Sequence, residues 1–379
     1  MVMPRNPFHY GSPVTEPHFT DRDTELRVLR SSMMNGQNLI LISPRRYGKT
    51  SLLMRAVSEV REAGGATGRV SLITCTSPRD VAETLAAGIV NGPLGWLRGR
   101  GEDLRRVLSR LRLAPQITLS AGGDISLRLL PGTQEPEWHT IIGDSVRMLR
   151  EATGTHPVSL VLDEFQRVGE IDPDLPGVFK DLTDELPEVS LIFAGSKRHL
   201  MEQMSRDAHE APLYGVGMKL YLHKIPEDLF AGYLMERARA GGKPMGEGAA
   251  RETWRLANGI PNDVQLIAFW AYEGTGESID EVAVMDAMEF AVGSQAVEFQ
   301  TVFDHLAPSQ QRLLKAVAEG RGSRLTSAGF LADLGLASPN AIIRARDILR
   351  DQELIEHEQG TGLWTVSSGL LRTWLLSGR

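Results

Sequence analysis

The sequence predicts an α/β fold in which a parallel sheet is followed by a region of helices only and by a small C-terminal domain. Short, continuously apolar runs at 39–42, 158–162 and 189–193 alternate with amphipathic helical patterns. Such runs are typical of strands that helices cover on both faces. After Pro226 we find helical patterns only, until three helices and two short strands complete the chain. We therefore expect three successive domains.

Length and composition agree with a multidomain globular protein. The chain has 379 residues, of which 42% are apolar and 23% are charged, enough for two or three domains of about 150 residues. We place the core at 1–225, a helical lid at 226–305 and the C-terminal domain at 306–379. An insertion at about 91–133, rich in glycine and arginine, interrupts the core.

Several classes of protein are excluded by simple observations. The single cysteine, Cys75, leaves no internal disulfide and no cysteine cluster for zinc. No apolar run approaches the ~20 residues that span a bilayer, and the first residues lack the apolar segment of a secretory signal. We expect a cytoplasmic protein with no membrane contact. The net charge of −7 gives no general attraction to nucleic acid.

The core elements can be assigned in order. An irregular arm ends near residue 19, and Thr20 with Asp23 forms a capping-box pattern that starts a helix. A strand at 39–42, a helix, a second strand at Arg69–Cys75 and a third helix follow. After the insertion come a helix that starts near Trp138 and further strands. These strands cover the ranges 158–162, 189–193 and 218–222.

The insertion has its own pattern. It contains a short helix around 104–111 and a β-hairpin of strands 116–120 and 124–130 around Ala121-Gly122-Gly123. This basic segment is either a solvated face or a contact surface for a partner. Its arginines are Arg98, Arg100, Arg105, Arg106, Arg110 and Arg112.

The most informative segment is the loop between the first strand and the helix after it. Ser43-Pro44-Arg45-Arg46-Tyr47-Gly48-Lys49-Thr50-Ser51-Leu52 approximates G-x-x-x-x-G-K-[ST], the P-loop in which backbone N–H groups and a helix N-terminus hold phosphates. Lys49 would reach the β- and γ-phosphates, and Thr50 would bind Mg²⁺. Ser43 stands in place of the first glycine, and Pro44 keeps it extended. The alternative is an arginine-rich surface turn.

A pair of carboxylates follows another buried strand. In Val158–Leu162 followed by Asp163-Glu164, Asp163 would hold Mg²⁺ and Glu164 would deprotonate the attacking water. Ser196 follows the next strand and would sense the γ-phosphate, or would cap the helix at 197–205. The chain has no N-K-x-D segment for guanine, so we expect ATP.

The order of these motifs resembles AAA+ ATPases of the STAND and archaeal-ATPase type, which are related to origin-recognition ATPases. Phe19–Leu26 is similar to their F-x-G-R-x-x-E-L motif, Pro44–Leu52 to P-R-R-x-G-K-T-S-L, and Gly259-Ile260-Pro261 to the G-x-P of the lid. The resemblance implies a P-loop core, a helical lid and a C-terminal winged helix. It places Arg22 beside the adenine and Pro261 against the nucleotide. The nucleotide-binding residues would be Arg45, Arg46, Tyr47, Gly48, Lys49, Thr50, Ser51, Arg22 and Pro261.

Two departures from the family pattern bear on activity. Asp21 replaces the usual glycine, which aspartate tolerates because it can adopt left-handed backbone angles. The segment 212–216 lacks the arginine that related proteins carry there. Since an arginine that stabilises the transition state accelerates phosphoryl transfer strongly, we expect slow hydrolysis or dependence on a partner.

The C-terminal domain matches the pattern of a winged helix-turn-helix. Helices at 310–318, 327–334 and from Pro339 precede two short strands around Gln359–Gly362. The third helix would present Asn340, Arg344 and Arg346 to a DNA major groove. Nine basic and seven acidic residues after 308 give a weak positive charge for phosphate contacts. The alternatives are packing against the core or self-association.

We therefore expect an ATP-dependent switch with slow, Mg²⁺-dependent hydrolysis. The alternative is a DNA-binding regulator for which ATP is a structural or conformational ligand. A third option is a defence or signalling ATPase whose effector is encoded elsewhere.

Overall fold

The structure, a computed structural model, describes residues 6–95, 101–109, 114–119, 125–130, 137–152, 156–206, 210–335, 338–358 and 361–378. The chain forms two compact units. The core unit contains Arg22–Arg45 and Lys49–His223. The C-terminal unit contains Met1–Asp21, Arg46–Gly48 and Lys224–Arg379. The division into three domains at 225 and 305 stays a prediction.

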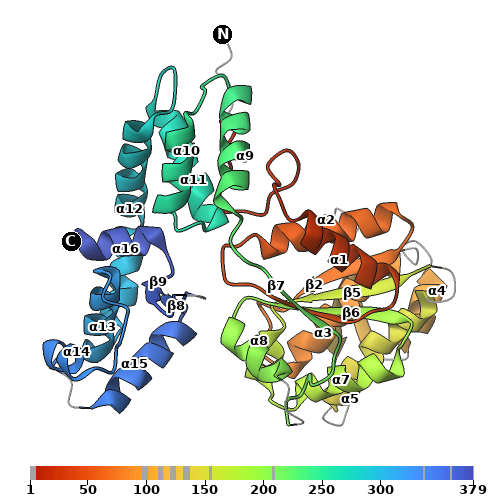
Figure 1. Cartoon of the computed structure of the whole chain (residues 1–379). Helices are drawn as coiled ribbons and strands as arrows, with labels where there is room; N and C mark the ends of the chain where they lie inside the picture. The colour runs from red at the N-terminus through yellow and green to blue at the C-terminus, as the bar shows by residue number, and fades with distance from the viewer. Residues whose placement is uncertain are drawn as a thin grey trace. The chain divides into compact units, whose positions relative to one another are not determined.

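A five-stranded parallel sheet forms the centre of the core unit (Figure 1). Its strand order is β2-β5-β6-β1-β7. Every residue of β1, β5 and β6 is buried, as continuous apolar strands between two helical layers should be. The predicted parallel sheet is confirmed. The bounds are β1 Leu39–Ile42, β2 Ala66–Ser71, β5 Val158–Asp163, β6 Val189–Gly195 and β7 Met218–Tyr221.

Helices cover both faces of this sheet. In Figure 1, α1 and α2 lie side by side on one face, and α3, α5 and α7 lie on the other. Phe165, Phe179 and Phe193 pack edge to face in the core beside the sheet, with ring centroids 4.8–6.4 Å apart. The helices are α1 Asp23–Met34, α2 Lys49–Glu62, α3 Pro78–Asn91, α5 Trp138–Arg147 with a 3₁₀ turn at Met148–Ala152, α6 Gln166–Ile171, α7 Leu175–Glu185 and α8 Arg198–Ser205.

The start of the first helix differs from the prediction. The helix begins at Asp23 with Arg22 as N-cap and without a side-chain cap, so the Thr20–Asp23 capping box was wrong. The reason is backbone conformation. Asp21 and Arg22 both have left-handed φ, 52° and 83°, which moves the N-cap two residues past Thr20. Asp21 adopts the left-handed angles expected of an aspartate that replaces glycine.

The second strand is also displaced from its predicted position. It covers Ala66–Ser71 rather than Arg69–Cys75. Gly68 looks like a turn residue, but a Cβ there would come within 2.8 Å of the Pro93 side chain and 3.0 Å of Gly92. The glycine therefore serves a close approach of the chain rather than a turn. Cys75 lies beyond the strand, buried and free.

The insertion forms a helix and a hairpin. Helix α4 covers Gly101–Leu108, and β3 Ala114–Leu119 pairs antiparallel with β4 Ile125–Leu130. The two hairpin strands are confirmed, whereas the predicted turn Ala121-Gly122-Gly123 lies outside the described residues, as do Arg98, Arg100, Arg110 and Arg112. The side-chain amide of Asn91 fixes β4 to the end of α3, with hydrogen bonds of 2.7 and 2.8 Å to the Ile125 backbone.

The C-terminal unit is mostly helical. Its long helix α12 runs to Asp304, and α16 was not predicted. The two short strands pair antiparallel, as expected of a wing. The elements are α9 Glu227–Ala240, α10 Glu247–Leu256, α11 Pro261–Gly274, α12 Glu281–Asp304, α13 Pro308–Ala318, α14 Ala328–Asp333, α15 Pro339–Asp351, β8 Ile355–His357, β9 Trp364–Val366 and α16 Gly369–Leu376.

One hydrophobic core joins the lid helices to the winged helix. Trp374 of α16 packs against Phe299 and Phe303 of α12, with ring centroids about 6 Å apart. From the N-terminal arm, Phe8 is buried against Tyr272. The final helix therefore packs against the C-terminal part of α12. Among the described residues, no helix is both long and apolar enough to span a membrane.

Candidate nucleotide-binding site

In the loop between β1 and α2, the backbone turns at Arg46 and Gly48 rather than at Ser43, the first residue of the loop. Arg46 and Gly48 have left-handed φ, 68° and 84°, and Ser43 does not. The Ser43 N–H donates to the Gly195 carbonyl at 3.2 Å, and its hydroxyl donates to the Pro44 carbonyl at 2.9 Å. Ser43 thus continues β1 in the sheet, and the turn is made farther along. A glycine is not required at this position.

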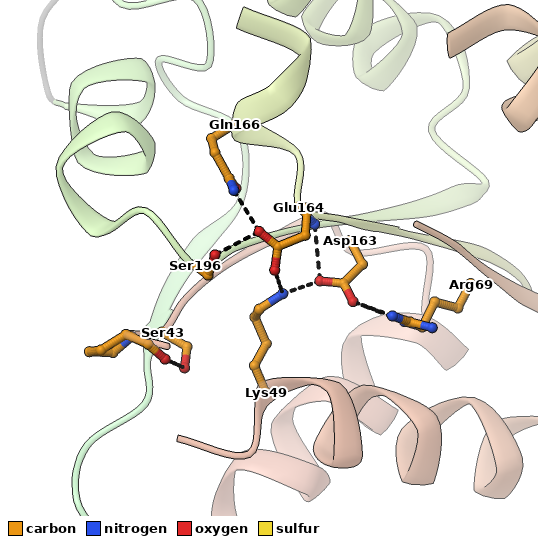
Figure 2. Close-up of polar contacts among 8 residues, drawn as sticks. Ser43, Lys49, Arg69, Asp163, Glu164, Gln166 and Ser196 are labelled. Atoms are coloured by element: carbon orange, nitrogen blue, oxygen red, sulfur yellow. Dashed lines mark hydrogen bonds and ion pairs between the residues drawn. The ribbon is translucent and has the colours of Figure 1, made fainter. Parts of the chain in front are cut away.

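Lys49, the first residue of α2, lies against two carboxylates (Figure 2). Its Nζ contacts Asp163 Oδ1 and lies 2.7 Å from Glu164 Oε1. The Lys49 and Asp163 side chains are only 6% and 1% exposed, so each buried charge needs the other. Lys49 and the two carboxylates after β5 therefore meet, while their roles toward phosphate, metal and water stay predictions.

Both carboxylate oxygens of Glu164 are held by neighbouring side chains. Its backbone is left-handed, with φ 59°, and its Oε2 accepts hydrogen bonds from Ser196 Oγ at 2.6 Å and Gln166 Nε2 at 2.5 Å. Burial would raise the pKa of Glu164, but the Lys49 charge and the hydrogen bonds from Lys49, Ser196 and Gln166 hold that pKa below its usual value. The carboxylate is therefore ionised and oriented.

The structure shows two residues here that the sequence analysis missed. Arg69 of β2 donates from Nε and Nη2 to Asp163 Oδ2, at 3.0 and 2.6 Å. Gln166 is 2% exposed and holds Glu164. An arginine inside a predicted buried strand was a usable signal for Arg69, because such a charge needs a partner. Gln166 carried no comparable signal.

The remaining predicted residues lie in different places. Ser196 contacts Glu164, and its predicted capping role was wrong because α8 starts at Arg198 with Lys197 as N-cap. Arg22 is buried in the core unit, donating to Glu25 at 3.0 Å and to the His223 carbonyl at 2.7 Å. Tyr47 and Ser51 are buried, Thr50 is half-buried, and Arg45 is exposed. Pro261 is the first residue of α11, in the C-terminal unit.

A second buried carboxylate lies in the C-terminal unit. Asp263 of α11 is 0% exposed. Its Oδ1 is 3.5 Å from Arg46 Nη1, and its Oδ2 accepts from Ser368 Oγ at 3.4 Å. Burial raises the pKa of Asp263, although Arg46 and the hydrogen bonds of Asn262 and Ser368 oppose this. The carboxylate thus joins the loop residue Arg46 to Ser368, the N-cap of α16.

The donor set at this site fits a magnesium ion. Mg²⁺ prefers oxygen ligands and is usually held by one or two carboxylates with phosphate oxygens and water. Thr50 and Asp163 offer such oxygens, and two cationic side chains already contact Asp163. No group of three or more His, Cys, Asp or Glu that could hold a metal occurs among the described residues. Thr50 and Asp163 would hold the metal together with phosphate oxygens and water.

On the winged helix, ion pairs occupy much of the positive charge. Arg346 of α15 lies over the Trp364 ring and 2.8 Å from Asp347. Arg350 pairs with Asp347 and Asp351. Asn340 and Arg344 are exposed. Of the three residues predicted to face DNA, Arg346 is engaged within the domain.

Comparison with known proteins identifies the fold. Residues 297–377 match a family described as a probable winged helix domain. The Walker-type ATPase PABY2304 of Pyrococcus abyssi is 19% identical, with TM-score 0.68 over 98% of this chain and 99% of that one. The Aeropyrum pernix ORC2 protein, solved in ADPNP–ADP complexes, is 15% identical, with TM-score 0.60 over 99% and 98%. No curated protein matched. The chain therefore shares its fold with these two solved proteins, and its C-terminal part matches a winged helix domain.

Proposed function

We propose that this protein binds ATP and hydrolyses it slowly, with Mg²⁺, as a nucleotide-dependent switch of the STAND type. The observation that carries the proposal is the Glu164 carboxylate, which Lys49, Ser196 and Gln166 hold beside Asp163. An oriented carboxylate next to a phosphate-binding lysine is what activation of a water requires. The similar proteins are named as a Walker-type ATPase and as an ADPNP–ADP complex, which supports ATP as the nucleotide.

The loop and the start of α2 would hold the phosphates. The backbone N–H groups at Arg45, Arg46, Tyr47 and Gly48, with those of Thr50 and Ser51, would surround them, since a helix N-terminus favours anions. Thr50 and Asp163 would hold Mg²⁺, which offsets the phosphate charge. Arg22 and Pro261 would contact the base and the nucleotide, as the family resemblance implies. These assignments are proposals.

Binding would change the partner of Lys49. Its Nζ now contacts Asp163 and Glu164, whereas a triphosphate offers it a greater negative charge. Transfer of Lys49 to the phosphates would free Glu164 Oε1, while Ser196 and Gln166 continue to hold Oε2. Without the Lys49 charge beside it, the effect of burial on Glu164 would be opposed less strongly. The pKa of Glu164 should therefore rise, which makes the carboxylate a stronger base.

Exchange of Glu164 for glutamine separates binding from turnover. Glu164→Gln keeps the shape and the contacts to Ser196 and Gln166 but cannot accept the proton. We expect ATP affinity within about threefold of the wild type and phosphate release slower by about 10²–10⁴-fold. Glu170→Gln is the matched control, since Glu170 pairs with Arg167 and Lys197 on α6 and before α8. Release at the wild-type rate by Glu164→Gln would contradict the assignment.

The second candidate is a DNA-binding regulator that uses the winged helix. The match of residues 297–377 and the exposed Asn340 and Arg344 favour it, whereas the pairing of Arg346 and Arg350 weighs against it. A steep loss of affinity for duplex DNA between about 50 and 200 mM salt would support DNA binding. No binding at low salt would leave protein contact or self-association as its role.

A further inference from the structure

Arg69 gives the candidate site an unexpected charge balance. Asp163 and Glu164 supply two negative charges, and Lys49 and Arg69 supply two positive charges (Figure 2). Arg69 comes from the neighbouring strand, where it is in register with Val161, and residues two apart on a strand share a face. Its side chain is 27% exposed, and its guanidinium donates two hydrogen bonds to one oxygen of the carboxylate that would hold the metal.

We propose that Arg69 is a positioning residue that neutralises Asp163 when no metal is bound, so that this site accepts a nucleotide without Mg²⁺. The inference rests on the proposed function. Without a counter-charge, Asp163 and Glu164 would repel a triphosphate, because Lys49 can balance only one of them. With Arg69 in place, the charges of Lys49, Arg69, Asp163 and Glu164 balance. The guanidinium thus takes the electrostatic role of the metal at Asp163.

Because Arg69 contacts Asp163, it would compete with the metal for this carboxylate. Mg²⁺ binds carboxylate oxygens directly or through water, and Asp163 Oδ2 is engaged by two N–H groups of Arg69. The metal must displace these hydrogen bonds or share the carboxylate. Arg69 therefore strengthens binding of the free nucleotide and weakens the additional effect of Mg²⁺.

The test compares nucleotide affinity with and without metal, in the full chain. A fluorescent ATP analogue is titrated once in EDTA and once in excess Mg²⁺. The measured quantity is the Kd in EDTA divided by the Kd in Mg²⁺. Arg69→Gln should raise this ratio roughly ten- to a hundredfold over the wild type, the range expected when a charged hydrogen bond is lost. Arg69→Lys, which keeps the charge, should restore most of the wild-type ratio.

Arg61→Gln is the matched control. Arg61 lies on α2 and donates to the Thr67 carbonyl of the same strand β2, at 3.3 Å, so its loss removes an equal charge beside the strand but not from Asp163. The control should keep the wild-type ratio. An unchanged ratio in Arg69→Gln, with intact binding by the wild type, would overturn this inference alone. No binding by the wild type in either buffer would overturn the proposed function and this inference with it.

Discussion

Asp163 and Glu164 are neighbours in the chain, yet different groups hold their carboxylates. Lys49 contacts both, whereas Arg69 holds only Asp163, and Ser196 and Gln166 hold only Glu164. The left-handed backbone of Glu164, with φ 59°, gives the two side chains these separate surroundings. Adjacent carboxylates can therefore serve different roles, one toward a metal and one toward water.

Part of this arrangement was predictable from the residues. Lys49, Asp163, Glu164 and Ser196 follow parallel strands, and the carboxyl ends of such strands meet at one edge of a sheet. The contact of Arg69 with Asp163 arises because β2 lies beside β5, and a single sequence does not show which strands are neighbours. The contact of Gln166 with Glu164 arises because α6 begins at Gln166, and no helix was predicted there. The contacts that depend on strand order and on this short helix were therefore not predictable.

Asp263 leads to a prediction about stability and pH. Because burial raises the pKa of Asp263 in the folded chain, its stabilising contribution is complete below the unfolded pKa of about 3.9 and is lost as pH rises through the folded value. Asparagine has a similar shape and does not ionise. Asp263→Asn should therefore unfold at a higher temperature than the wild type at neutral pH, and the difference should shrink toward pH 4.

Thermal unfolding at several pH values measures this difference. Asp286→Asn, at an exposed position on α12, is the control and should change the free energy of unfolding by no more than about 0.5 kcal/mol. If Asp263→Asn were less stable than the wild type at neutral pH, the ion pair with Arg46 would outweigh the cost of burial.

At the scale of the elements, buried apolar strands were predicted best. Strands β1, β5 and β6 were located because short, continuous apolar runs between helical patterns are typical of strands in a parallel sheet. Strand β2 begins at Ala66 rather than Arg69, and Gly68 within it permits the close approach of Pro93 and Gly92. Helix α16 was missed because its run Gly369–Leu376 is apolar on most sides, being packed between the lid and the wing. Tertiary packing, rather than the local sequence pattern, therefore determines the bounds of β2 and the presence of α16.

Helix α16 leads to a prediction about the contact between the winged helix and the lid. Gly369 lies against the backbone carbonyl of Leu256, so that a Cβ at Gly369 would overlap this oxygen. Gly369→Ala should push α16 away from α10 and lower the free energy of unfolding of the C-terminal unit by about 1–3 kcal/mol. Chemical denaturation followed by tryptophan fluorescence would measure the loss, because Trp374 lies on this helix.

Gly329→Ala is the control for this substitution. A Cβ at Gly329 in α14 has no atom within 4 Å, so alanine there should be neutral or stabilise by up to about 1 kcal/mol. Equal stability of the two alanine variants would contradict the proposed anchoring of the winged helix by α16.

At the scale of the whole molecule, the P-loop core and the winged helix belong to different compact units, and each was predicted from its own pattern. The loop tip Arg46–Gly48 groups with the C-terminal unit, where the Arg46 carbonyl accepts from the Asn262 N–H at 3.3 Å and its guanidinium meets Asp263. Within this unit, Asp263 of α11 also accepts a hydrogen bond from Ser368, the N-cap of α16.

The central claim is that Lys49 and the carboxylates after β5 form an ATP site. Calorimetric titration of the full chain with ATP in Mg²⁺ tests it most directly, beside Lys49→Ala and the control Lys180→Ala, whose lysine pairs with Asp184 on α7. Circular dichroism would verify that each variant is folded. We predict one ATP per chain in the wild type and the control, and an affinity lower by about a hundredfold or more in Lys49→Ala. Equal affinity in a folded Lys49→Ala would contradict the claim.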